Sequence, residues 1–532
     1  MRQKEKSKRK SLPKSKPLGL YLFLMFTIFP LFCTDGYFHI RLDRYYFFLW
    51  SSLGAMVVQG LFRLLGGSEN RDLPHNLQAV KAVADGAWYR RLSAGDWAMV
   101  LFVLAAAVSA LWSEYPAESF YGTLGRNNGV ILLAVYAGVY FIVSRCYDHR
   151  NYIFVGLALC TTAVSVLAVL NFYHLDPLNM IRRLAPEDRL IFISTIGNKN
   201  LLSAYLCMMV PAAGALFIFG REKPVMVVSL LASMMGFAGL MCADSDSGFL
   251  GMGAFAVVFL LICIPNPERL KRYFLVLTVM LLGARVPALF GDHHKALGTF
   301  QQFFVASTES LCLIPVMAAV TALLYLLHHK KPQLRFPKGV RNVLSLMVAA
   351  TLLATVAAVV YVTFLVPDYP LESPWTLLRV DDRWGTLRGF IWKRSFLLFG
   401  DFSLKEKLLG SGPDTYYGVF SPNFAELIQL GGNAADAAHN EYLNYLITQG
   451  LVGLGAWLTL LVSNLVHALR GMKTDPMYAV FAAAVIGCSA QAMVNIAQPI
   501  TTPLMILFIA LCGAKIPLTS TKGPSRAYHK KR

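Results

Sequence analysis

Long apolar runs recur along this chain from end to end, and they constrain its fold more than any other feature. Of the 532 residues, 56% are hydrophobic and only 15% are charged. Soluble domains usually carry more charge than this, whereas a helix that crosses a bilayer needs about 20 apolar residues in a row. We therefore predict an all-α integral membrane protein with about 12–14 transmembrane helices.

The apolar runs predict individual spans, and the last two lie so close together that one of them could be re-entrant. The predicted spans are 18–33, 45–65, 96–112, 128–144, 151–172, 199–219, 224–242, 247–264, 272–290, 309–328, 341–366, 443–467, 477–495 and 500–514. They divide the chain into a basic tail (1–17), a first group of eleven spans (18–366), a long loop (367–442), a second group of spans (443–514) and a second basic tail (515–532).

The distribution of Lys and Arg predicts the orientation of the chain. If the basic N-terminus lies in the cytoplasm and the spans alternate, 33 of the 49 Lys and Arg residues fall on the cytoplasmic side. This excess agrees with the positive-inside rule. We therefore expect a multi-pass protein of the cytoplasmic membrane with both termini in the cytoplasm. The net charge of +19 then reflects topology and attraction to anionic membrane lipid, not nucleic-acid binding.

The loop 367–442 stands out on the predicted outer side, where most other connections are short. Long ordered loops in compact proteins are usually functional. We expect this loop to carry short helices, and it is unusually basic for an outer segment.

Within the loop, residues 383–396 read RWGTLRGFIWKRSF, and Trp384, Arg388 and Trp392 follow one another at a helical spacing of four. Basic residues among tryptophans are typical of a helix that lies in the membrane interface. Arg388, with Arg383 and Trp392 beside it, could equally hold the phosphates of a lipid-linked substrate, because a guanidinium group pairs with phosphate in bidentate fashion. The two interpretations weigh evenly.

At the end of the loop and the start of the next span, residues 439–458 read HNEYLNYLITQGLVGLGAWL. Asn440 suits the N-cap of the helix that follows. The N-terminus of a helix disfavours a protonated histidine, which leaves His439 as a neutral imidazole that can accept a proton. A hydrogen-bonded interfacial histidine is the commoner case, so this stretch alone makes His439 and Asn440 candidates for catalysis and substrate binding without deciding the matter.

Other polar side chains fall at the predicted outer ends of spans. Asn198 and Asn200 lie at the outer start of the sixth span, where an asparagine can cap the helix or bond a sugar hydroxyl, and capping is the commoner role. Candidates for binding an anionic substrate are Arg126 at the mouth of the fourth span, Arg189 in the loop before the sixth, and Arg285 in the outer part of the ninth. Ionisable residues inside spans are costly and often functional.

Residues 243–247 read ADSDS, which places Asp244 and Asp246 in a DxD spacing. Two carboxylates are too few to predict a metal site, so we expect a short polar turn between two spans. The chain has no GxxxxGK phosphate-binding sequence, which argues against ATP-driven transport by this chain alone.

Three stretches together resemble the O-antigen ligase and polymerase family of bacterial membrane proteins. They are STIGNKNLLSAYL (194–206), RGFIWKRSFLLF (388–399) followed by KLLGSGPDTY (407–416), and HNEYLNYLITQGLVGLG (439–455). The resemblance covers about residues 110–510 and includes the order of the spans. It implies a glycosyltransferase at the outer face of the cytoplasmic membrane that needs neither metal nor other cofactor. The donor would be a glycan on undecaprenyl diphosphate, and the acceptor another glycan, a lipid-bound sugar or a protein.

The resemblance also implies roles for single residues. His439 corresponds to the family's presumed base, and Arg388 corresponds to a basic position that would bind the diphosphate. The family often has an arginine in the stretch that reads SDSG (245–248) here, so Asp246 is a departure. A second phosphate-binding cation would then come from Arg126, Arg189 or Arg285.

Two other functions stay open at this point. Many spans with few hydrophilic parts also suit a transporter, although transporters usually place charged residues near mid-membrane, and here the charges gather at the outer ends. The departure at Asp246 leaves room for a non-catalytic subunit of an envelope-polysaccharide assembly complex.

Overall fold

The computed structural model describes residues 16–65, 92–123, 126–289, 297–331, 337–367, 370 and 375–514. The predicted tail 515–532, and the tail 1–17 apart from its last two residues, lie outside these ranges. The described elements are almost all helices, as the sequence predicted. The longer ones are α1 (Lys16–Thr27), α2 (Ile40–Leu65), α4 (Ala94–Leu111), α6 (Val130–Cys146), α7 (Asn151–Phe172), α8 (Lys199–Phe219), α9 (Lys223–Cys242), α10 (Ser247–Cys263), α11 (Pro267–Ala284), α13 (Thr308–Lys330), α14 (Lys338–Val360), α15 (Trp384–Asp401), α19 (Glu441–Gly471), α20 (Met477–Gln491) and α21 (Thr502–Cys512).

Each predicted span overlaps one of these helices. Within the described ranges, nine helices are long and apolar enough to cross a membrane, and α1, α6, α10 and α21 are shorter apolar helices. The predicted span 272–290 falls on α11, whose first two turns carry Glu268, Arg269, Lys271 and Arg272 and so make it less apolar. The fold is therefore that of an all-α integral membrane protein.

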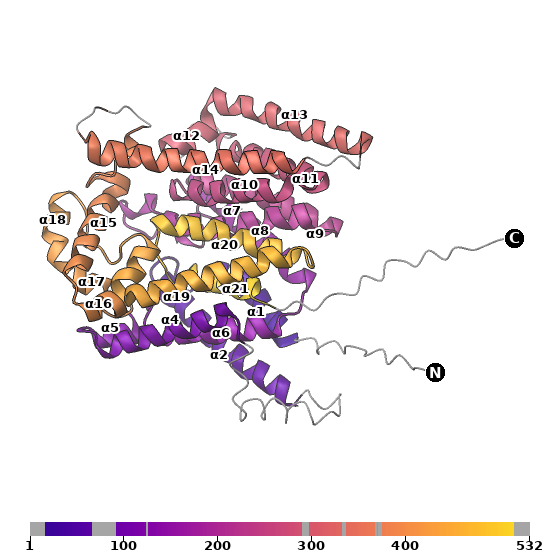
Figure 1. Cartoon of the computed structure of the whole chain (residues 1–532). Coiled ribbons are helices and arrows are strands. Elements are labelled where there is room, and N and C mark those ends of the chain that lie inside the picture. The colour runs from indigo at the N-terminus through magenta and orange to yellow at the C-terminus, as the bar shows by residue number, and fades with distance from the viewer. Residues whose placement is uncertain are drawn as a thin grey trace.

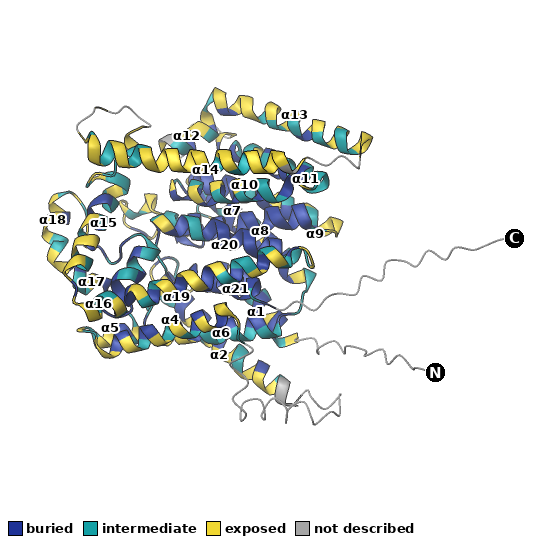
Figure 2. Ribbon diagram, in the orientation of Figure 1, coloured by how far each residue is buried: buried dark blue, intermediate teal, exposed yellow. Residues whose placement is uncertain are grey.

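The helix α8 forms the centre of the bundle. It is apolar on all sides and every residue of its most apolar window is buried, as expected of a helix surrounded by others. It packs against α7, α9, α10, α11 and α20. Figure 2 shows α8 and α20 as largely buried, whereas α13 and α14 at the margin are largely exposed. Apolar faces of this kind suit contact with lipid chains.

The loop 367–442 carries helices, as predicted. Figure 1 shows α15 with α16 (Leu404–Leu409), α17 (Tyr416–Phe420) and α18 (Phe424–Gln429) at one end of the bundle, beside α5 (Pro116–Tyr121). We call this end the loop end. Here Ser113, which follows α4, donates its hydroxyl proton to the carbonyl of Ser411 over 2.6 Å. A short hairpin of β1 (Phe192–Ile193) and β2 (Gly197–Asn198) precedes α8, and α12 (Thr299–Ala306) precedes α13.

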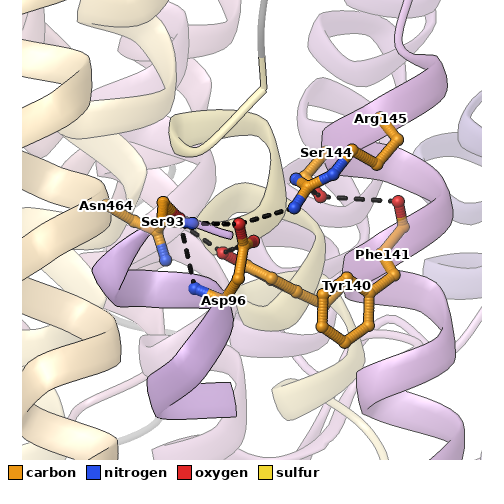
Figure 3. A network of polar contacts seen from close by, with 7 residues as sticks. All are labelled: Ser93, Asp96, Tyr140, Phe141, Ser144, Arg145 and Asn464. Carbon is orange, nitrogen blue, oxygen red and sulfur yellow. Dashed lines mark hydrogen bonds and ion pairs between the residues drawn. The ribbon is translucent and has the colours of Figure 1, made fainter. Parts of the chain in front are cut away.

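At the opposite end of the bundle, a buried carboxylate links three helices (Figure 3). Asp96 in α4 is 2% exposed and forms an ion pair with Arg145 in α6 at 2.5 Å. It also accepts hydrogen bonds from the Ser93 backbone amide at 2.7 Å and the Tyr140 hydroxyl at 3.1 Å. The Tyr140 hydroxyl lies 3.3 Å from the side-chain oxygen of Asn464 in α19. This network anchors α4, α6 and α19 far from the loop end.

Candidate functional site

A cavity of about 580 Å³ opens at the loop end, between segments that are far apart in the sequence. Its size falls within the range of small-molecule sites, about 300–1,000 Å³. The start of α2, the start of α8, the end of the long loop and the connection before α21 contribute to it. Its lining consists of residues 37–42, Phe192, Asn198, Asn200, Leu201, Asp436, His439, Asn495, Ile496, Gln498 and Ile500.

His439 lies in the wall of this cavity, and the backbone on both sides of it is fixed. The Trp392 indole donates to the Ala438 carbonyl at 2.9 Å. On the other side, the Asn440 side chain accepts the backbone amides of Tyr442 and Leu443, each at 3.1 Å, which confirms the predicted N-cap. His439 itself has a φ of 49°, an uncommon backbone conformation for a residue other than glycine. The chain thus holds this histidine in one place at the head of α19.

The imidazole of His439 is neutral at neutral pH. Burial, together with the positive charges of Arg388 and Arg126, lowers its pKa to about 4, although Asp436 acts in the opposite direction. The sequence had suggested a neutral imidazole because of the helix N-terminus, whereas the larger causes are burial and two arginines. A neutral imidazole can accept a proton from a hydroxyl group.

Arg388 lies on α15, close enough to His439 to lower its pKa. Its guanidinium donates to the Gly385 carbonyl at 2.7 Å. Its buried Nε atom makes no hydrogen bond to the part of the chain that the structure describes. Burial lowers the pKa of Arg388, and Asp246 opposes this shift. The neighbouring Lys393 and Arg394 pair with acidic residues of the loop instead.

The predicted helical spacing of Trp384, Arg388 and Trp392 is wrong at its start. Gly385, Thr386 and Leu387 have positive φ angles between 58° and 71°, so regular helix begins only after them. The kink still brings the rings of Trp384 and Trp392 to a centroid distance of 5.3 Å. Arg388 therefore begins the regular part of α15 and is not in the middle of a continuous helix.

Arg126 is buried, at 4% exposure, and its charge is already paired. Its Nε and one terminal nitrogen donate to the two carboxylate oxygens of Asp436 at 3.0 and 2.8 Å. This bidentate pair lowers the pKa of Asp436 even though burial acts to raise it. The structure therefore places Arg126 behind the cavity wall, where it holds Asp436 ionised.

The other predicted arginines lie outside the cavity lining. Arg285 donates to the Ser307 carbonyl at 3.0 Å and lies 3.1 Å from the Ser310 hydroxyl. Arg189 donates to the carbonyls of Leu184 at 3.0 Å and Arg182 at 3.2 Å. Arg383 is exposed at the start of α15.

The two predicted asparagines both line the cavity. Asn198 caps α8, because its side-chain oxygen accepts the Asn200 backbone amide at 2.8 Å. The side-chain oxygen of Asn200 accepts the Ser245 hydroxyl at 2.8 Å. Ser245 belongs to the ADSDS stretch, which forms a short turn between α9 and α10 as predicted. The described residues contain no group of three or more His, Cys, Asp or Glu side chains that could hold a metal ion.

Sequence reasoning missed Arg41, an exposed cation in the cavity lining. It makes no hydrogen bond or ion pair to the described residues, but it helps to lower the pKa of Asp436. Its segment is held in place, because the Tyr37 hydroxyl donates to the Ser194 carbonyl at 2.5 Å and Arg44 donates to the Thr195 carbonyl at 2.8 Å. The sequence offered one signal for Arg41: it is a basic residue in the short segment 34–44, which lies on the predicted outer side.

The stretch KLLGSGPDTY ties the long loop to α19. Gly410 and Gly412 have φ angles of 77° and 117°, and the backbone amides of Ser411 and Gly412 donate to α19 carbonyls at 3.1 and 2.9 Å. Gly450 breaks the helix at this contact with a φ of 65°. Asp414 accepts the Thr123 and Asn128 backbone amides, and burial raises its pKa to about 6. The stretch therefore holds the long loop against the first half of α19.

Comparison with known proteins bears on this end of the chain. Residues 302–458 match the family model described as O-Antigen ligase, a segment that contains Arg388 and His439 and leaves out Arg41, Asn200 and Gln498. A search of curated proteins found no match to the chain. The match confirms the resemblance drawn from the sequence and supports a membrane enzyme of cell-surface polysaccharide assembly. Over residues 302–458, this multi-pass membrane protein is therefore similar to the O-antigen ligase family.

Proposed function

We propose that the protein is a glycosyltransferase that transfers or polymerises a glycan carried on undecaprenyl diphosphate, at the outer face of the cytoplasmic membrane. One observation carries the proposal: a neutral His439 lies in the wall of a cavity of about 580 Å³, with Arg388 near enough to shift its pKa. A base beside a fixed cation is what transfer from a diphosphate leaving group requires.

In the proposed reaction, the oxygen of an acceptor hydroxyl attacks the anomeric carbon of the donor sugar. The bond between that carbon and the diphosphate oxygen breaks, and the diphosphate leaves with the electron pair. His439 accepts the proton of the attacking hydroxyl. Arg388 stabilises the negative charge that develops on the diphosphate, since its Nε has no hydrogen-bond partner in the described part of the protein.

The second cation is Arg41 in this proposal. Asp246 stands where the family often has arginine, and a carboxylate cannot bind an anion as arginine does. It accepts a hydrogen bond from Gln301 at 3.1 Å. It also lies near enough to Arg388 to affect the pKa of that arginine. Arg126 is occupied by Asp436. Arg41 is a cation that forms no ion pair with the described residues, and it lines the cavity that contains His439. Replacing Arg41 with Ala should weaken donor use more than replacing it with Lys, which keeps the charge.

The test compares the surface glycans of the wild type with those of three strains: a deletion strain, one with His439→Ala, and one with His467→Ala. His467 is an exposed histidine at the far end of the same helix, so its variant is a matched control. We expect His439→Ala to behave like the deletion and His467→Ala like wild type.

The length of the glycan chains on gels then separates polymerase from ligase activity. Loss of long polymer with retention of single lipid-linked repeats indicates a polymerase, and accumulation of long lipid-linked chains indicates a ligase. Wild-type glycans in the His439→Ala strain would remove the catalytic assignment.

A further inference from the structure

Four side-chain amides line the same cavity, and the proposed chemistry uses none of them. They are Asn198, Asn200, Asn495 and Gln498. We propose that these amides form a subsite for an uncharged sugar ring of the acceptor, and that Gln498 is a specificity-determining residue in it. The inference rests on the proposed function, because it places the acceptor in the cavity that holds His439.

Gln498 gives the strongest evidence for a missing ligand. Its residue is only 6% exposed, yet its side-chain oxygen makes no hydrogen bond to any described residue. A buried acceptor without a partner is unfavourable and rare in proteins. Because this side chain also lines the cavity, a hydroxyl group of a bound molecule can donate to it.

The backbone around Gln498 is fixed before any ligand arrives. The backbone N–H of Gln498 donates to the Thr502 hydroxyl at 2.9 Å. The Asn128 side chain donates to the Ala497 carbonyl at 3.0 Å. The unpartnered oxygen is therefore not the end of a free loop. A polar group held in place in this way can discriminate between ligands that offer a donor there and ligands that do not.

The other amides are close to one another and also fixed. The Asn495 side chain donates to the Asn200 carbonyl at 3.2 Å, which joins the connection before α21 to the start of α8. Asn200 is held by Ser245, and Asn198 by the cap of α8. The amide set is thus preorganised, which reduces the entropy lost on binding.

The chemistry of this set favours an uncharged sugar. An amide both donates and accepts hydrogen bonds, as a sugar hydroxyl does, and none of the four groups carries a charge. Phe38 and Phe192, also in the lining, add apolar ring surface for the carbon–hydrogen face of a sugar. A lipid tail would leave the buried amides without partners. A phosphate would be attracted to arginine instead.

The test measures binding of simple sugars to the purified full-length protein in lipid nanodiscs by saturation-transfer NMR. The probes are uncharged methyl glycosides of glucose, galactose, mannose, rhamnose, N-acetylglucosamine and N-acetylgalactosamine. Gln498→Met removes the amide at nearly constant shape, and Asn200→Asp keeps the acceptor for Ser245 while removing two donor hydrogens. The matched control is Gln449→Met, because Gln449 is also buried with an unpartnered side-chain oxygen but lies outside this cavity.

We expect at least one glycoside to bind wild-type protein and the Gln449→Met control with equal affinity. Loss of one hydrogen bond should weaken that binding roughly tenfold in Gln498→Met, and similarly in Asn200→Asp. Failure of every glycoside to bind wild type, or unchanged affinity in both cavity variants, would overturn the subsite. His439→Ala should lose glycan transfer and keep glycoside binding. Full transfer by His439→Ala with glycoside binding still dependent on Gln498 would instead reject the catalytic role and leave the subsite standing.

Discussion

At the scale of single residues, the charge state of His439 controls the proposed reaction. Only the neutral imidazole accepts a proton, so activity should fall as the pH drops through the pKa of this group. In the free enzyme that pKa is about 4, and kcat/KM reports the free enzyme. We therefore expect kcat/KM to rise with pH up to about 4 and then to level off. A bound diphosphate would offset the positive charge of Arg388, raise the pKa of His439, and move the acidic limb of kcat to higher pH.

The two limbs can be measured with purified protein, a lipid-linked donor and a series of buffers of constant ionic strength. His467→Ala should leave both limbs in place. An acidic limb of kcat/KM at pH 6.5, the ordinary value for histidine, would mean that burial and the arginines do not act on the catalytic base as proposed.

At the scale of elements, the contact between the long loop and α19 depends on a glycine. Gly450 has a φ of 65° and a ψ of −169°. Residues other than glycine rarely adopt this backbone conformation, which costs them roughly 1–3 kcal/mol of stability. A Cβ atom there would also lie 2.4 Å from the backbone of Leu408. Gly450→Ala should therefore lower the Tm of the purified protein. Gly455→Ala is the matched control, since a Cβ at Gly455 meets open space on the same helix. Equal Tm values for the two variants would show that the break at Gly450 is not under constraint.

The helices could be predicted from the sequence because each is encoded locally, in a run of apolar residues. The predicted spans 151–172 and 199–219 have the same bounds as α7 and α8. The kink before Arg388 could not be predicted, because Thr386 and Leu387 have positive φ angles, which residues other than glycine seldom adopt. The ion pair between Arg126 and Asp436 joins residues 310 positions apart in the sequence. The pattern of residues around either one does not predict such a contact.

The same reasoning explains which parts of the site were found. His439 was identified because it stands next to a recognisable helix start and in a stretch that resembles a known family. Arg41 and Gln498 were missed because each lies in a short connection between predicted spans (34–44 and 496–499), without a pattern of its own. The fold brings these connections together only after α2, α8 and α19 have packed, and the cavity exists only at that level.

At the scale of the whole molecule, the two ends of the bundle differ in chemistry, and the proposed function requires the loop end to face outward. Leu404 in α16 is exposed at the loop end, and Lys473 is exposed just beyond the other end of α19. In a variant with serine at Cys33, Cys146 and Cys312, the remaining native cysteines are buried, so an added cysteine is the main target of a membrane-impermeant maleimide.

Leu404→Cys in that background should react with the maleimide in right-side-out membrane vesicles, and Lys473→Cys should react only in inverted ones. This orientation follows from the excess of Lys and Arg on the side of the predicted cytoplasmic segments. Labelling after detergent solubilisation is the control, since both variants should then react fully. The reverse pattern would place His439 and its cavity on the cytoplasmic side. A base at that face could not act on a glycan displayed outside the membrane, so the orientation tests the proposed function independently of any catalytic variant.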